Sequence, residues 1–261
     1  MKLLQQLSEH ADELTITREL IHAIQQASQF FKMRDDGNQW MYRGMEHSLI
    51  PQDSFVALYQ PRKDRRPKDM PLVLHNELND HLTKQFGIPY RSEGLFAAGN
   101  QSFAANYGKV GIVLPQGAFK FCWSPDVPDA YAHFELPPAL RYIRTMATGR
   151  GHNAEEIPTT IHRGEFLHFL NDSEWGMSLF REWFAIEYHK SQYTDRDLAA
   201  AIYSENEIMI SCSEYAVIRD TELVRKYYID AAEHILGAPV NVRQDPNMKQ
   251  FINAITASLT P

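Results

Sequence analysis

Two carboxylates, Glu205 and Glu207, stand on either side of Asn206 at the start of an apolar run. If this segment is a β-strand, residues i and i+2 point to the same face, so the two carboxylates share a face at a spacing of roughly 6.5–7 Å. Like charges that close resist simultaneous ionisation, which suits a site where one group binds a cation and the other handles a proton. Taken alone, the segment is more typical of a solvated turn before a core strand.

A fixed cation lies far upstream, where Arg43 closes the aromatic run Trp40-Met41-Tyr42 and Gly44 follows it. The sequence has no phosphate-binding glycine motif, no His-Glu-x-x-His and no Gly-x-Ser-x-Gly elbow. Its 11 histidines show no metal-ligand spacing, and 2 cysteines are too few for the common zinc clusters, so no metal is expected. A ligand that carries its own reactive bond suits what remains: an arginine, aromatic side chains and paired carboxylates.

Composition limits the class of protein. The 261 residues, 44% of them hydrophobic, can bury a full core in one domain. A formal net charge of −7 argues against general nucleic-acid binding, which needs a basic surface. No run approaches the ~18 apolar residues of a membrane span, and the N-terminus lacks the apolar core of a signal peptide. Cys122 and Cys212 lie in apolar surroundings and are expected as buried free thiols, which favours a reducing, cytoplasmic compartment.

Helical periodicity predicts most of the secondary structure. Within residues 1–35, one helical face gathers Leu14, Ile21, Ile24, Ala27 and Phe31. Thr194 and Asp197 resemble a capping box that opens a helix running to about Tyr203. Further helical segments are expected at 72–86, 102–107, 137–148, 164–190, 221–236 and 246–259.

Short apolar segments between turn signals predict strands at 39–45, 55–60, 95–98, 109–114 and 119–123. The segments 207–210 and 215–218 are expected to pair as a hairpin across 211–214. Strands interspersed with helices, without a regular βαβ rhythm, indicate an α+β fold. Residues 61–71, between the predicted strand 55–60 and the predicted helix 72–86, are expected to form an exposed loop. This loop could also reach an anionic partner through its basic residues Arg62, Lys63, Arg65, Arg66 and Lys68.

Three of these segments resemble the motifs of mono-ADP-ribosyltransferases of the arginine–serine–glutamate class. That class has an aromatic-Arg-Gly strand, a Ser-Thr-Ser strand and a Glu-x-Glu turn, in the order in which this chain has Tyr42-Arg43-Gly44, Leu95-Phe96 and Glu205-Asn206-Glu207. The stretch from Arg91 to Gly108, with Pro115 and Trp123-Ser124-Pro125, is also similar to ADP-ribosyltransferase-like proteins of phages. The resemblance covers about residues 39–220.

The resemblance implies a split β-sandwich that binds NAD in a cleft. Arg43 would bind the diphosphate or the nicotinamide ribose, and Gly44 would let the backbone approach the nicotinamide amide. Glu207 would bind the ribose 2′-hydroxyl and stabilise the oxocarbenium-like cation, while Glu205 would orient or deprotonate an acceptor, with arginine as the first guess. Aromatic stacking on the nicotinamide would come from Phe96, Phe103 or Tyr107, and the remaining candidate ligands are Tyr42, Arg91, Asn100 and Ser102.

One departure from the class stands in the middle motif, where Ala97-Ala98-Gly99 replaces Ser-Thr-Ser. Alanine cannot donate the hydrogen bond that positions the catalytic glutamate, and Ser92, Asn100 or Ser102 could take that role. Two alternatives to a transferase therefore stay open: an NAD glycohydrolase that uses water as acceptor, and a non-catalytic phage-type protein that keeps the fold to bind a host partner.

The expected organisation is one domain over residues 1–261. It has a helical N-terminal segment at 1–35, an NAD-binding catalytic core at 39–220 and C-terminal helices at 221–261. A protein acceptor is favoured over nucleic acid, no membrane association is expected, and the location is the cytoplasm, that of the host if the source is a phage.

Overall fold

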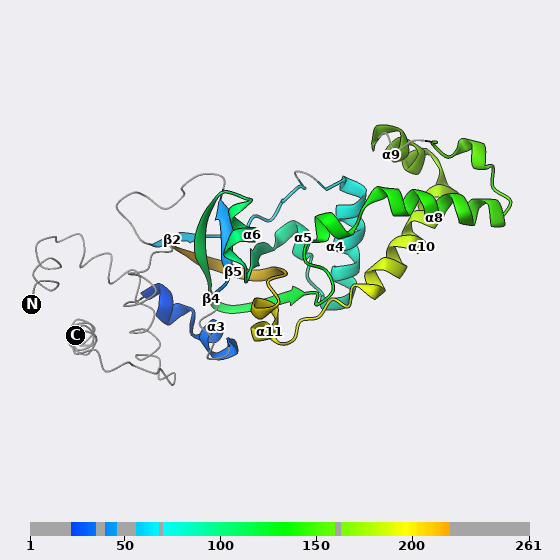
Figure 1. Cartoon of the computed structure of the whole chain (residues 1–261). Helices are drawn as coiled ribbons and strands as arrows, with labels where there is room; N and C mark the ends of the chain where they lie inside the picture. The colour runs from blue at the N-terminus through cyan, green and yellow to red at the C-terminus, as the bar shows by residue number, and fades with distance from the viewer. Residues whose placement is uncertain (1–21, 35–39, 46–55, 68–69, 160–162, 220–261) are drawn as a thin grey trace, which may run out of the picture. The chain divides into compact units, whose positions relative to one another are not determined.

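A computed structural model describes residues 22–34, 40–45, 56–67, 70–159 and 163–219 (Figure 1). Although one domain is expected, the contacts of the chain gather in two compact units. The first unit takes residues from 1–61, 95–121 and 197–261, and the second takes 62–94 and 122–196. The expected C-terminal helices at 221–236 and 246–259, and Leu14 and Ile21 of the N-terminal segment, lie outside the described residues.

A five-stranded sheet forms the centre of the first unit. Its strands are β1 Tyr42–Met45, β2 Val56–Tyr59, β3 Leu95–Ala98, β4 Lys109–Trp123 and β5 Glu207–Arg219. They lie in the order β2-β5-β3-β1-β4, and a further pairing of β5 with β4 closes the sheet into a small barrel. The expected mixture of helices and strands is therefore confirmed.

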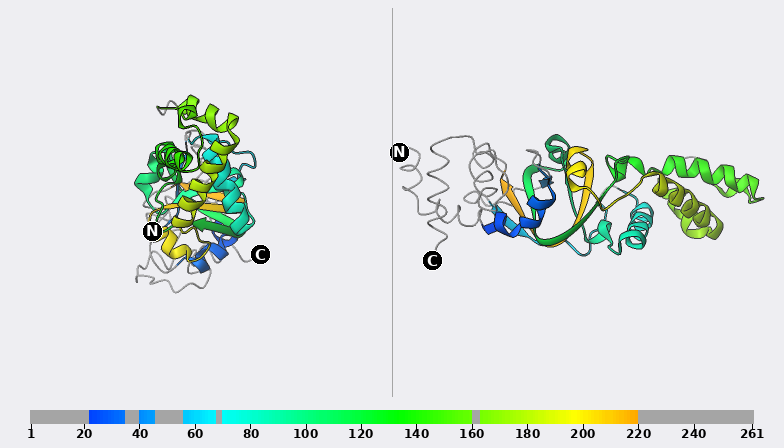
Figure 2. Two further views of the ribbon diagram at one scale, coloured as in Figure 1. Left: turned by 90° about the vertical axis from the view of Figure 1, so that its right-hand side faces the viewer. Right: turned by 90° about the horizontal axis from the view of Figure 1, so that it is seen from below.

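The predicted hairpin of 207–210 with 215–218 is wrong, because β5 is one 13-residue strand (Figure 2). Its first part pairs antiparallel with β3, and its last part pairs antiparallel with β2. The polar segment between them contains no glycine, proline or asparagine to make a tight turn, so the strand continues from one neighbour to the next. Likewise, the predicted strands 109–114 and 119–123 are both parts of β4, in which Gly117 has a φ of 64°.

Helices α3 Ser28–Met33, α6 Gln101–Ala105 and α11 Leu198–Tyr203 also belong to this unit, and residues 22–26 are helical. A turn at Ala27 interrupts the N-terminal helical run, and the buried face takes in Ala23, Ala27 and Phe30. Phe31, placed on the apolar face from the sequence, is partly exposed. The predicted cap of α11 is also wrong: Asp197 itself caps the helix, accepting from the backbone N–H of Ala200 at 2.9 Å. Aspartate caps a helix at least as well as threonine.

The second unit is helical. Its elements are α4 Leu72–Phe86, α5 Tyr90–Glu93, α7 Ala130–His133, α8 Leu136–Gly149, the 3₁₀ turn η1 Ala154–Glu156, α9 Arg163–Asp172 and α10 Glu174–Lys190. The bounds of α4 are those predicted, and Gly87 ends it at a φ of 73°. Residues 164–190 are mainly helical, as predicted, and they form two helices because Ser173 accepts from the N–H of Gly176 and caps α10.

The cysteines match their predicted state in part. Neither forms a disulfide, and Cys122 is buried, whereas Cys212 is only partly buried. No helix among the described residues is long and apolar enough to span a membrane.

Buried basic groups lie together in the second unit. His75 on α4 is 4% exposed and Arg91 on α5 is 7% exposed. Burial lowers the pKa of His75 to about 4, and the charges of Arg91 and Arg65 add to the shift. Because the same imidazole in the unfolded chain takes up its proton near pH 6.5, the unfolded state binds more protons between these two values.

The free energy of unfolding should therefore depend on His75 below neutral pH. We expect its full value above about pH 6.5, and a fall on the order of 1–2 kcal/mol, allowing for solvent screening, as the pH drops to about 4. Urea unfolding across this range measures the effect, and His75→Gln should flatten the dependence. His189→Gln, an exposed position on α10, is the control. An unchanged pH dependence in His75→Gln would contradict the assignment.

Candidate functional site

Three segments that are far apart in the sequence lie on adjacent strands of the barrel. Tyr42 on β1 pairs with Ala98 on β3, and Ala98 pairs with Glu207 on β5. Directly paired residues of antiparallel strands point to the same face. One residue each of the aromatic-Arg-Gly segment, the middle segment and the Glu-x-Glu segment thus lies in one row across three strands.

Helix α6 covers the face that carries this row, which we call the α6 face. Gly44 is two residues after Tyr42 on the strand and so lies on the same face. A Cβ at Gly44 would lie 1.9 Å from the carbonyl oxygen of Ala104 and 2.9 Å from Cβ of Tyr107. Only glycine permits this approach of α6 and of the turn that follows it. Gly44 thus has a packing role in addition to the ligand role that the resemblance implies.

Arg43 lies on the opposite face from Glu207, because neighbours along a strand alternate. Its partner across the sheet is Gly111, whose Cβ would meet the Val217 side chain. Arg43 donates from Nη1 to the carbonyl oxygen of Phe96 at 3.3 Å, and its guanidinium lies 5.9 Å from the centre of the Tyr215 ring. Burial lowers the pKa of the Arg43 guanidinium. The sheet therefore does not bring Arg43 and Glu207 to one face, and diphosphate binding by Arg43 stays a prediction.

Glu205 and Glu207 were expected to share one face of a strand, but only Glu207 lies in the strand. Glu205 precedes β5 with a φ of 64°, in the left-handed region, so the alternation rule for strands does not apply to it. Its exposed carboxylate accepts a hydrogen bond from Nδ2 of Asn100 at 2.6 Å. Of the three residues that could replace the missing serine, Asn100 is the one with a described contact to a glutamate of this segment.

The other predicted ligands divide between the two units. Arg91 and Ser92 belong to the second unit, where the side chain of Asn79 accepts from both of their backbone N–H groups. Phe96 is partly exposed on β3, and Ser102 is exposed on α6. The Tyr107 ring lies edge-on to Phe103 at 5.7 Å and is 51% exposed beside Gly44.

Sequence reasoning missed the second role of Asn100. Its Oδ1 accepts from the N–H of Phe103 at 2.9 Å and caps α6. Asparagine directly before a helical turn is a capping signal, so this contact could have been predicted. The contact with Glu205 has no local signal, since it joins residues 105 positions apart.

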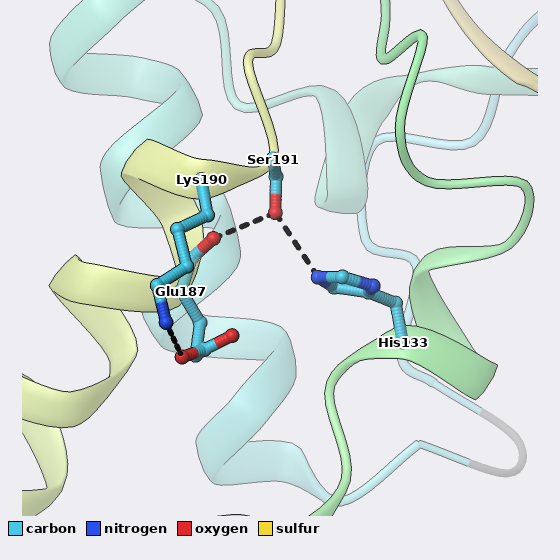
Figure 3. Close-up of polar contacts among 4 residues, drawn as sticks. All are labelled: His133, Glu187, Lys190 and Ser191. Carbon is cyan, nitrogen blue, oxygen red and sulfur yellow. Dashed lines mark hydrogen bonds and ion pairs between the residues drawn. The ribbon is translucent and has the colours of Figure 1, made fainter.

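A serine–histidine contact in the second unit resembles a nucleophile and its base, but its geometry excludes that role (Figure 3). Ser191 Oγ lies 3.3 Å from Nε2 of His133 and donates to the backbone carbonyl of Glu187 at 2.8 Å. Ser191 is 0% exposed, so no substrate reaches the hydroxyl. The neighbouring ion pair of Lys190 with Glu187, 2.8 Å long, also lies within α10. These contacts stabilise the C-terminal end of α10.

Comparison with models of protein families, with curated proteins and with solved structures finds no match to this chain. The described residues contain no group of three or more histidine, cysteine, aspartate or glutamate side chains that could hold a metal ion. The candidate site therefore rests on the residues of the α6 face and the turn beside it: Tyr42, Gly44, Ala98, Asn100, Tyr107, Glu205 and Glu207.

The close approach at Gly44 gives a test of this packing. We expect Gly44→Ala to lower the free energy of unfolding by about 1–3 kcal/mol, the usual cost of overpacking. Gly149→Ala at the end of α8 is the matched control, because a Cβ there has nothing within 4 Å. Thermal unfolding of both variants measures the difference, and equal stability would contradict the close packing of α6 on β1.

The Arg43→Ala variant tests whether Arg43 has a structural role or binds the nucleotide. Arg43→Ala removes its bond to Phe96 and its packing on Tyr215, and we expect the free energy of unfolding to fall by about 1–2 kcal/mol. Calorimetric titration with NAD and denaturant unfolding are run on the same preparation. Unchanged stability together with a tenfold or greater loss of NAD affinity, about 1.4 kcal/mol per decade, would instead make Arg43 a ligand of the nucleotide.

Proposed function

We propose that this chain cleaves the nicotinamide–ribose bond of NAD and transfers ADP-ribose to a macromolecular acceptor. The observation that carries the proposal is the row formed by Tyr42, Ala98 and Glu207, which joins the three motif segments on adjacent strands. Within this proposal the barrel corresponds to the split β-sandwich of the ADP-ribosyltransferase class, and the α6 face corresponds to its NAD-binding side.

The chemistry needs one carboxylate at the ribose. As the bond from ribose C1′ to the nicotinamide nitrogen breaks, its electron pair leaves with nicotinamide, which becomes neutral, and positive charge develops on the ribose. A carboxylate held near that ribose stabilises the oxocarbenium-like cation, as in glycosidases. Glu207 is the candidate, because it begins β5 on the same face as Gly44 and beside Ala98. The acceptor then bonds to C1′ and loses a proton.

The nicotinamide is expected beside Gly44 and Tyr107. The half-exposed Tyr107 ring, which packs against Gly44, offers a stacking surface for the nicotinamide. Glu205, exposed and held by Asn100, is the candidate that meets the acceptor. The net charge of −7 favours a protein acceptor over nucleic acid.

A non-catalytic binding protein of the same fold is the second candidate. Two observations favour it: Ala97 and Ala98 have no hydroxyl to offer a glutamate, and Arg43 faces away from Glu207. An NAD glycohydrolase would use the same residues, with water as the acceptor. Incubation with NAD labelled in the adenine ring distinguishes the three: label on an acceptor, free ADP-ribose, or unchanged NAD.

Glu207 is tested by a variant that keeps its size. Glu207→Gln loses the negative charge, and we expect nicotinamide release to fall by about two orders of magnitude, the usual effect of removing one preorganised electrostatic group. The melting temperature should stay within about 2 °C, because the exchange is nearly isosteric. Glu214→Gln on the same strand is the control and should keep the wild-type rate. Full activity of a folded Glu207→Gln would remove this carboxylate from the reaction.

A further inference from the structure

Asn100 uses both ends of its side-chain amide. The oxygen accepts from the N–H of Phe103 at 2.9 Å, and the nitrogen donates to Oε2 of Glu205 at 2.6 Å. Aspartate could make the first contact but has no hydrogen to donate in the second. The two contacts join the turn between β3 and α6 to the turn between α11 and β5, and they require an amide at this position.

Glu205 has an unfavourable backbone conformation for its side chain. It follows α11 with a φ of 64°, at a position where helices commonly have glycine, and its N–H donates to the carbonyl of Ile202 at 3.3 Å. Left-handed backbone costs free energy in any residue with a Cβ, and such positions cluster at functional sites. The surrounding structure holds the turn: a Cβ at Gly99 would lie 1.7 Å from the same Ile202 carbonyl oxygen.

We propose that Asn100 is the positioning residue for Glu205. This inference rests on the proposed function. Asn100 holds Oε2, which leaves Oε1 of the exposed carboxylate to meet the acceptor. As the acceptor nitrogen or oxygen forms its bond to C1′ of the ribose, its proton passes to Oε1 of Glu205. Asn100 thus acts on transfer, whereas bond cleavage depends on Glu207.

The test reverses the direction of the hydrogen bond. Asn100→Asp keeps the cap of α6 but places two carboxylates together, and Glu205→Gln removes the charge of the acceptor group. In the double variant, the amide introduced at position 205 can donate to the carboxylate introduced at position 100, so the contact is restored with its polarity reversed. Asn106→Asp, an exposed position at the other end of α6, is the control for adding a charge.

Two quantities are measured on the full chain: the unfolding equilibrium constant, and the ratio of labelled acceptor to free ADP-ribose with a mixed-protein acceptor and NAD. We expect Asn100→Asp to raise the unfolding constant about tenfold and to lower the product ratio at least about tenfold. The double variant should regain most of the stability while its product ratio stays low, because the carboxylate is no longer at position 205. Asn106→Asp should change neither quantity.

The outcomes separate this inference from the proposed function. Additive effects on stability, with no recovery in the double variant, would overturn the contact itself. Recovery of stability together with a wild-type product ratio in Asn100→Asp would overturn the positioning role. If the wild-type chain leaves NAD unchanged while stability still recovers, the proposed function fails, the positioning role fails with it, and the contact remains a structural one.

Discussion

The structure of the first unit depends on the backbone pairing of β5. One end of this strand pairs with β3, the other end with β2, and a further pairing with β4 closes the barrel. Because the register of an antiparallel pair decides which side chains share a face, the pairing of Ala98 with Glu207 fixes the glutamate opposite the middle motif. A slip of one residue would move Glu207 to the face of Arg43. The candidate site is therefore set by strand register more than by any single side-chain contact.

Glycine and asparagine residues allow the helices and turns to pack closely around the paired strands. Gly44 and Gly99 allow helical segments to approach the strands more closely than a Cβ permits. Asn100 then connects the resulting turns through its two hydrogen bonds. The residues that shape the site are small or polar: the motifs single out Gly44 and Asn100, whereas the close approach at Gly99 has no signal in the hydrophobic periodicity.

Local signals predicted much of the secondary structure. The bounds of α4 follow from its apolar periodicity and from Gly87, and β1, β2 and β3 follow from short apolar segments between turn residues. The errors arose where a long-range partner decides the outcome. Residues 211–214 interrupt the apolar run with polar side chains, yet they continue a strand because β2 offers further pairing. The opposite faces of Arg43 and Glu207 follow from cross-strand register, which a single sequence does not reveal. The three motif segments lie on or beside adjacent strands, as the pairings of Tyr42 with Ala98 and of Ala98 with Glu207 show.

The left-handed turn at Glu205 has a consequence for how this protein responds to mutation and selection. A glycine at that position would relax the backbone, but it would also lose the hydrogen bond from Asn100. Under the proposed function, selection for the acceptor step would keep a carboxylate at position 205 although the backbone there favours glycine.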